Sequence, residues 1–212
     1  MEAITLKLPE TLDELDENEL VRLPATWDEY LELVDEVPYT VQFLNHEVII
    51  SQTSRLHESL VIILGRLLGN YFLDKEGYDV LDSNVKIMIP NQEGDFNADL
   101  SVVKEPVEYG TTPTGRASTM RMANPEIVVE ILSKSTRNFD EGEKLAYYKL
   151  IPSLHHILLV DQTRPFASVY SRTGNPDEWL NHDYRTLESV VRLGNLALPM
   201  QGIYRKAVFE SR

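Results

Sequence analysis

The run PEIVVEIL at residues 125–132 constrains the fold of this chain more than any other segment. It is a nearly continuous apolar stretch interrupted by one acid in its middle, Glu130. Such a run predicts a strand that is buried on both faces, as in a parallel or mixed sheet covered by helices. Because side chains alternate along a strand, we expect Val128, Glu130 and Leu132 on the same face.

Glu130 is the first candidate for chemistry, because a buried carboxylate has a large desolvation cost unless it is paired, protonated or bound to a metal. A second acid, Asp99, lies in the segment ADLSVV and is predicted to stand on a neighbouring strand. Two converging carboxylates repel each other unless a cation lies between them, so the pair indicates a divalent metal site. A structural ion pair at Glu130 and a turn role for Asp99 stay open as alternatives.

Two further charged residues are candidates, and both lie on predicted helices. In the helix predicted over 138–151, Lys144 falls in the middle of the core-facing arc, where a lysine needs an acidic partner or a phosphate. The alternatives are an ion pair with Asp140 or a side chain that snorkels to solvent. Glu58 opens the helix predicted over 55–73 and is either an additional metal or water ligand or an acid favoured by the helix dipole.

The remaining patterns predict an α/β chain with one mixed sheet and helices packed on it. Thr26 is the expected N-cap of a helix over 26–37, and a β-hairpin over 39–50 is expected to turn at Asn45–His46. Residues 105–124 are predicted to form a long loop, and the tail one or two strands and a short helix. Further strands are predicted over 78–82, 84–90, 98–103, 155–161 and 166–171.

Length and charge limit the number of domains and the partners. A chain of 212 residues, 42% of them apolar, is enough for one sizeable core. Its net charge of −14 argues against a general polyanion binder. However, residues 1–47 hold 13 acids and 2 bases, and the remainder, with 21 acids and 18 bases, could meet a phosphate backbone locally. We interpret 1–25 as an acidic, mobile N-terminal segment and 26–212 as a single domain.

Several classes of site and location are disfavoured by the sequence. The chain has no cysteine, so neither a disulfide nor a thiolate metal site is expected. Its beginning lacks the basic and apolar regions of a secretory signal, and its apolar stretches are too short to cross a bilayer. We therefore expect a cytoplasmic protein with no membrane partner. The motifs of zinc proteases, phosphate-binding loops and serine hydrolases do not occur.

Three segments carry a resemblance to a known group: ADLSVV at 98–103, PEIVVEILSKSTRNFDEGEKLAYYKL at 125–150 and HHILLVD at 155–161. In these segments the chain resembles the Uma-type restriction endonuclease family, within the PD-(D/E)XK nuclease superfamily. The resemblance implies a restriction endonuclease-like α/β core, in which helices flank a mixed β-sheet. The N-terminal helix and β-hairpin would precede this core.

The resemblance also implies an activity and a set of site residues. Asp99 and Glu130 would hold Mg²⁺, or Mn²⁺, for phosphodiester hydrolysis in nucleic acid, with DNA as the expected substrate. The lysine of the superfamily motif would stand at position 132, where this chain has Leu132. Lys144, on the following helix, is the implied replacement, and Lys134 is a weaker candidate. Glu58 would assist at the metal.

The partners implied by this activity are a nucleic acid and a second copy of the chain. Arg116, Arg121 and Arg137 could track a phosphate backbone, and cutting both strands commonly needs two sites, so a homodimer is expected. Two alternatives stay open. The chain could be a catalytically inactive nuclease-fold module that acts in nucleic-acid or protein binding. It could also be an acidic partner-binding protein whose residues 10–36 contact a basic surface.

Overall fold

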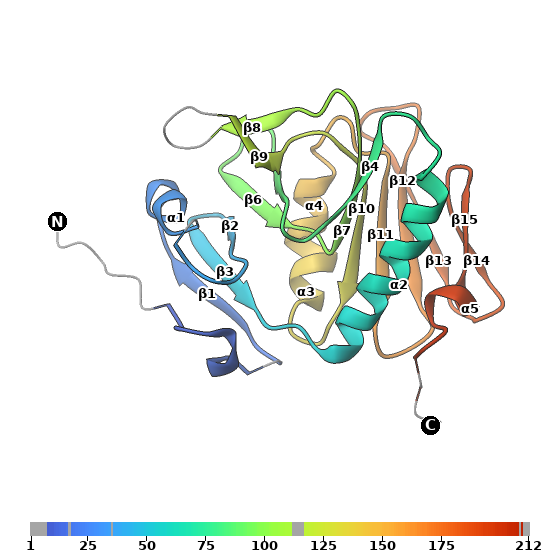
Figure 1. The fold of residues 1–212 in the computed structure, drawn as a ribbon, viewed down its shortest axis with the longest axis horizontal. Helices are drawn as coiled ribbons and strands as arrows, with labels where there is room; N and C mark the ends of the chain where they lie inside the picture. Colours follow the sequence, from blue (N-terminus) through green and yellow to red (C-terminus); the bar gives the residue numbers. More distant parts are fainter. Residues whose placement is uncertain (1–7, 17, 35, 112–116, 208, 210–212) are drawn as a thin grey trace.

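The strands form two large mixed sheets in the computed structural model, which describes residues 8–16, 18–34, 36–111, 117–207 and 209 (Figure 1). The single mixed sheet predicted from the element order is therefore wrong. The seven-stranded sheet has the order β1-β3-β2-β6-β5-β9-β8. Its strands are β1 (Leu20–Pro24), β2 (Gln42–Leu44), β3 (Glu47–Ser51), β5 (Lys86–Met88), β6 (Gly94–Asn97), β8 (Tyr109–Thr111) and β9 (Ala117–Met122).

The six-stranded sheet has the order β13-β12-β11-β10-β7-β4, with β10 in its interior. The strand β10 pairs antiparallel with β7 and parallel with β11, so both of its edges are satisfied. The last two strands, β14 and β15, form a separate two-stranded sheet. The bounds are β4 (Tyr78–Asp82), β7 (Leu100–Lys104), β10 (Pro125–Leu132), β11 (His156–Asp161), β12 (Ala167–Arg172), β13 (Trp179–Tyr184), β14 (Val190–Leu193) and β15 (Leu196–Pro199).

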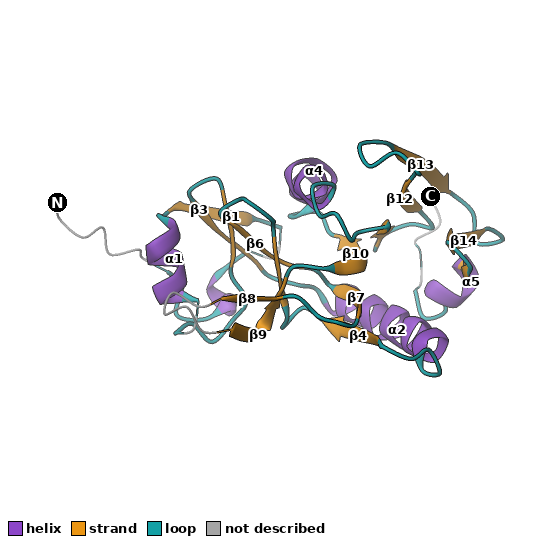
Figure 2. Cartoon of the chain, turned by 90° about the horizontal axis from the view of Figure 1, so that it is seen from above, coloured by secondary structure: helices purple, strands orange, loops and turns teal. Residues whose placement is uncertain are grey.

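Helices cover both faces of the six-stranded sheet, as the apolar run of β10 predicts (Figure 2). On one face, Val129 and Ile131 pack in a core with α2 (Arg55–Phe72) and α5 (Met200–Ile203). On the other face, Val128 and Leu132 pack in a core with the helical segment at 137–148. That segment consists of α3 (Arg137–Phe139), the π-helical η2 (Asp140–Lys144) and α4 (Leu145–Tyr148). The predicted alternation along β10 is confirmed.

The N-terminal helix and hairpin are also confirmed. Thr26 caps α1 (Trp27–Leu33) in a capping box with Glu29, and β2 and β3 are joined at Asn45 and His46, whose φ angles are 51° and 62°. Before α1 the structure has a short 3-10 helix, η1 (Leu12–Glu14), and β1, which pairs with β3. Part of the acidic segment is thus a sheet strand, while the domain division at residue 25 stays a prediction.

Two regions differ from their predicted structure. Residues 105–124 were expected to be a long loop, but they contribute β8 and β9 to the edge of the seven-stranded sheet. The strand β9 pairs parallel with the distant β5, a tertiary contact that the glycine- and proline-containing sequence does not signal. The tail has three strands, β13 to β15, and the short helix α5. Within the described residues, no helix is long and apolar enough to span a membrane.

A two-residue connection joins the two sheets and fixes the position of the candidate site. The strand β6 ends at Asn97 in one sheet and β7 begins at Leu100 in the other, so only Ala98 and Asp99 lie between them. Asp99 is therefore placed at the junction of the sheets rather than inside a strand. The pairing of β7 with β10 then brings Asp99 next to the second half of β10.

Candidate active site

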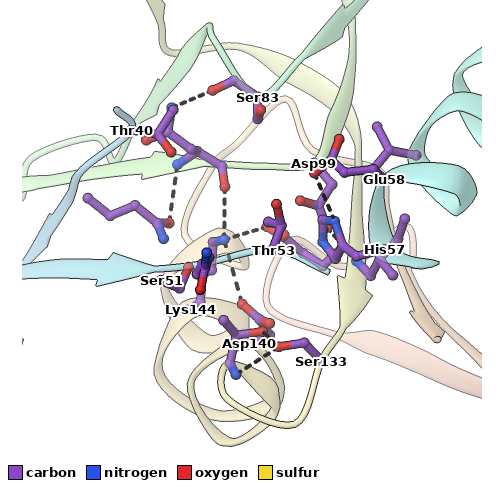
Figure 3. A pocket seen from close by; sticks show the side chains of 17 residues that line it. Thr40, Ser51, Thr53, His57, Glu58, Ser83, Asp99, Ser133, Asp140 and Lys144 are labelled. Carbon is purple, nitrogen blue, oxygen red and sulfur yellow. Dashed lines mark hydrogen bonds and ion pairs between the residues drawn. The ribbon is translucent and has the colours of Figure 1, made fainter. Parts of the chain in front are cut away.

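A cavity of about 80 Å³ opens at the junction of the sheets, next to the N-terminus of α2 (Figure 3). Its walls come from both sheets, from α2 and from the helical segment after β10. The four residues predicted to form the site all line it: Glu58, Asp99, Glu130 and Lys144. The cavity has room for several water molecules. Residues that are 72 positions apart in the chain, Glu58 and Glu130, thus contribute to one pocket.

Glu130 is buried in the floor of this pocket, with 3% of its surface exposed. Its Oε1 atom lies 2.9 Å from Lys144 Nζ and accepts a hydrogen bond of 2.6 Å from the hydroxyl of Tyr148. Burial, together with the charges of Asp99 and Asp140, raises the pKa of Glu130 to about 8 against the opposing effects of the Lys144 charge and the Tyr148 hydrogen bond. The side chain therefore sits among several like charges and one cation.

Lys144 points into the protein, as the helical wheel predicts, and is only 2% exposed. Its ammonium group contacts Glu130, donates a 3.0 Å hydrogen bond to the carbonyl of Asn97, and lies 3.6 Å from Asp140 Oδ1. Burial lowers the pKa of Lys144, but the charges of Glu130, Asp140 and Asp99 outweigh it, so the pKa lies above its ordinary value. Lys144 is thus a buried ammonium ion held by carboxylates.

Asp99 faces the same pocket from the junction of the sheets, with 15% of its side chain exposed. Its Oδ2 atom accepts a 2.6 Å hydrogen bond from the backbone N–H of Ile131 and lies 3.1 Å from His57 Nε2. Within the described part of the chain, its other oxygen, Oδ1, forms no hydrogen bond. The carboxylate is therefore fixed over β10 with one oxygen left to meet a ligand.

His57 and Glu58 form the wall that α2 contributes. Ser54 caps this helix by accepting from the backbone N–H of His57, which places the His57 imidazole against Asp99. Burial lowers the pKa of His57, but the hydrogen bond and charge of Asp99 and the charge of Glu58 together raise it above its ordinary value. Glu58 Oε1 lies 3.4 Å from His57 Nδ1, and its side chain is 56% exposed, so it stands at the mouth of the pocket.

Three residues of this cluster were not singled out from the sequence. His57 was not among the candidates, yet its side chain contacts Asp99. Asp140 was considered only as a helix neighbour of Lys144, and it is 4% exposed with its pKa raised by burial to about 6. Tyr148 was not among the candidates either, and its hydroxyl donates to Glu130. The four-residue spacing of Asp140, Lys144 and Tyr148 was the available signal, because it puts all three on one helix face.

The arginines that were expected to track a phosphate backbone have different positions. Arg121 is 5% exposed and pairs with Asp95 in the interior of the seven-stranded sheet, so its assignment as a surface contact is wrong. Arg137 is partly exposed and binds Asp161 at 2.8 Å. Arg116 lies outside the described residues. Leu132, at the position of the superfamily lysine, is fully buried in the core beside α4.

The pocket offers few oxygen donors for a divalent cation. Among the described residues, no group of three or more His, Asp or Glu side chains is arranged to hold a metal ion. Asp99 and Glu130 still offer two hard oxygen donors in one pocket, and the charge of Asp99 raises the pKa of Glu130. Magnesium is commonly held by one or two carboxylates, several waters and substrate phosphates. A two-carboxylate site of this kind fits the residues present.

Comparisons with known proteins match this chain to one family profile, two relatives and one solved structure. A family profile described as "Uma2: Putative restriction endonuclease" matches residues 27–201. Two uncharacterized proteins of Synechocystis sp. are each 30% identical to this chain; the matches cover 72% of the chain and 82% of the first relative, and 74% and 78% for the second. A crystal structure of a putative nuclease belonging to DUF820, from Anabaena variabilis, has a TM-score of 0.66 at 15% identity, covering 86% of this chain and 98% of that one. That likeness concerns the fold.

Proposed function

The chain belongs to the Uma2 family of putative restriction endonucleases, and from this premise we propose that it is a metal-dependent endonuclease. The reaction is hydrolysis of phosphodiester bonds in nucleic acid, with DNA as the expected substrate. The fold is then interpreted as a restriction endonuclease-like core in which β7, β10 and the following helix carry the active site. The observation that carries the proposal is the convergence of Asp99, Glu130 and Lys144 in one pocket.

Asp99 and Glu130 are the residues that would hold Mg²⁺, or Mn²⁺, in this proposal. One support is the Oδ1 atom of Asp99, which forms no hydrogen bond to the residues that the structure describes. The other is the charge of Asp99, which raises the pKa of Glu130 and which a cation between the two carboxylates would offset. When bound, the ion supplies a water of lowered pKa and neutralises charge on the phosphate. Glu58 stands at the pocket mouth, where its exposed carboxylate can bind a water of the metal shell.

The other residues of the pocket hold these groups in place. His57 donates to Asp99 and so fixes the orientation of that carboxylate, as histidines and carboxylates around metal sites commonly do for each other. Tyr148 does the same for Glu130. Lys144 keeps its positive charge in the buried pocket, where it can orient the attacking water and stabilise the charge that develops on the phosphate.

The experiment that tests the proposal compares cleavage of DNA by the wild-type protein and two variants of β10. Glu130→Gln should lose activity by about 100-fold or more, because removing one electrostatic group of an active site costs that much. Glu126→Gln is the matched control, since Glu126 lies on the same strand but lines a different cavity. The wild-type and control proteins should cleave DNA in Mg²⁺ and stop in EDTA. Equal cleavage with and without EDTA would overturn the proposal.

The inactive nuclease-fold module is the second candidate function. It is favoured by Leu132, which occupies the position of the superfamily lysine, and by the pKa of Glu130 at about 8, which disfavours the metal-binding form near neutral pH. Calorimetric titration with Mg²⁺ separates the two candidates. An enzyme should show saturable binding that is lost in both Asp99→Asn and Glu130→Gln, and an inactive module should show none.

A further inference from the structure

A second groove lies on α2, one helical turn beyond the candidate active site. It is lined by Ile62, Ile63, Arg66, Arg205 and Lys206, and it has a volume of about 320 Å³. Three of these five residues are basic and none is acidic, in a chain that has 34 acids and 20 bases. Such a local excess of positive charge runs against the overall composition and therefore indicates an anionic ligand.

The three basic side chains of this groove are accessible to a ligand, and the backbone before two of them is anchored. Within the described residues, Arg66, Arg205 and Lys206 form no ion pair, and all three are exposed. Arg205 and Lys206 directly follow Tyr204, whose hydroxyl donates to the carbonyls of Asp161 and Phe166 at 2.7 Å. Arg205 and Lys206 lie in the turn after α5, and α5 packs against α2 in the core of the six-stranded sheet (Figures 1 and 2). This packing brings the two bases of the turn next to Arg66 of α2 in one groove.

The groove and the mouth of the active-site pocket lie along the same face of α2. Glu58, at the pocket mouth, and Ile62 and Arg66 follow each other at four-residue intervals, so they share one exposed face of α2. The eight residues between Glu58 and Arg66 span about 12 Å along the helix axis. One nucleic-acid strand rises about 3.4 Å per nucleotide, so this distance corresponds to three or four nucleotides.

We infer that the groove binds the phosphate backbone of the nucleic-acid strand as it leaves the active site. Arg66, Arg205 and Lys206 contact phosphates three or four nucleotides from the bond that is cleaved, and Ile62, which is 70% exposed, packs against the sugars between them. This inference rests on the proposed function, and it adds the direction in which the substrate runs and a minimum length for full affinity.

The test uses two triple variants with the same net charge. The groove variant carries Arg66→Ala, Arg205→Ala and Lys206→Ala, and the control carries Lys75→Ala, Lys104→Ala and Arg192→Ala, three exposed bases away from the groove. Binding of a long fluorescein-labelled DNA duplex is measured by anisotropy in EDTA over a range of salt concentrations. In parallel, hydrolysis of bis(p-nitrophenyl) phosphate, which has no flanking nucleotides, is measured in Mg²⁺.

The groove variant should bind the duplex about tenfold or more weakly, and the slope of log K against log salt should flatten by about 0.9 for each lost phosphate contact. It should hydrolyse the small phosphodiester like the wild type, and the control should keep the wild-type salt slope. If wild-type protein binds and cleaves DNA but the two variants bind alike, the inference about the groove is overturned and the proposed function survives. If the wild type neither binds nor cleaves nucleic acid, both fall together.

Discussion

Replacing the buried lysine of the pocket, Lys144→Met, should destabilise the protein by an amount that depends on pH. Lys144 Nζ lies 2.9 Å from Glu130, a separation at which two unit charges attract by about 6 kcal/mol at an effective dielectric constant of about 20. Desolvation of both groups offsets part of this attraction. Removing one partner of a buried pair nevertheless costs about 3–5 kcal/mol, because the other charge stays buried without compensation.

The pH dependence follows from the carboxyl groups that remain. The pKa of Glu130 is raised to about 8 and that of Asp140 to about 6, and the variant loses the cation that opposes both shifts. A carboxyl with a raised folded pKa makes the free energy of unfolding fall as pH rises, until pH reaches that folded pKa. In the wild type this fall ends near pH 6 for Asp140 and near pH 8 for Glu130, whereas in the variant the folded pKa values lie higher and the fall continues. Relative to the wild type, Lys144→Met should therefore lose about 1 kcal/mol of unfolding free energy near pH 5 and about 3–5 kcal/mol above pH 8.

Urea unfolding followed by circular dichroism at pH 5.5 and 8.5 measures this difference. Lys149→Met is the matched control, since Lys149 directly follows the same helical segment and is partly exposed. The free energy of unfolding should change little in this variant at both pH values. Adding Glu130→Gln to Lys144→Met should recover part of the loss at high pH, because the uncompensated charge is removed. The reasoning is refuted if the free energy of unfolding lost in Lys144→Met differs by less than about 0.5 kcal/mol between the two pH values. Strict additivity of the effects of the two substitutions would also refute it.

Three further predictions concern the residues around the site and the second sheet. His57→Asn should weaken Mg²⁺ binding about 10–100-fold in calorimetry, because the group that orients Asp99 is lost; unchanged affinity would contradict the role of the imidazole. Arg121→Met should lower the free energy of unfolding by about 3–5 kcal/mol, because Asp95 is left buried, and a stability equal to wild type would contradict this. Tyr148→Phe should cost about 1–2 kcal/mol in urea unfolding through the lost hydrogen bond to Glu130, and no loss would mean that the hydroxyl is not needed.

The part of the site on and after β10 could be predicted from the sequence, because local periodicity determines which way its side chains face. Alternation along β10 separated Glu130 from the face that packs on α2, and the helical wheel turned Lys144 inward. Both inferences need only the type of element, strand or helix, and the residue period of that element. They therefore hold although the exact bounds of the helical segment differ from the prediction.

The arrangement of the two sheets could not be predicted, because it depends on pairings between distant strands. The pairing of β2 with β6 and of β5 with β9 decides that a second sheet exists, and the sequence carries no local signal for either. The same limit explains Arg121, which looked like a surface base in a loop but faces Asp95 once β9 joins this sheet. The contact of His57 with Asp99 likewise follows only from the way α2 approaches the junction.

The π-helical turn at Asp140–Lys144 has a consequence for how chains of this kind tolerate insertions and deletions. A π-turn holds one residue more than an α-turn over nearly the same rise, so it behaves as a single-residue insertion inside a helix. Deleting Gly142, which has no side chain to pack, would let the segment relax to an ordinary α-helix while the residues on either side of the turn keep nearly the same relative orientation. Alignments of related chains are therefore best read with a one-residue gap permitted at this turn. A one-residue deletion in a regular α-turn of the segment, in contrast, would rotate its two sides by about 100° and misalign the ammonium with its carboxylate.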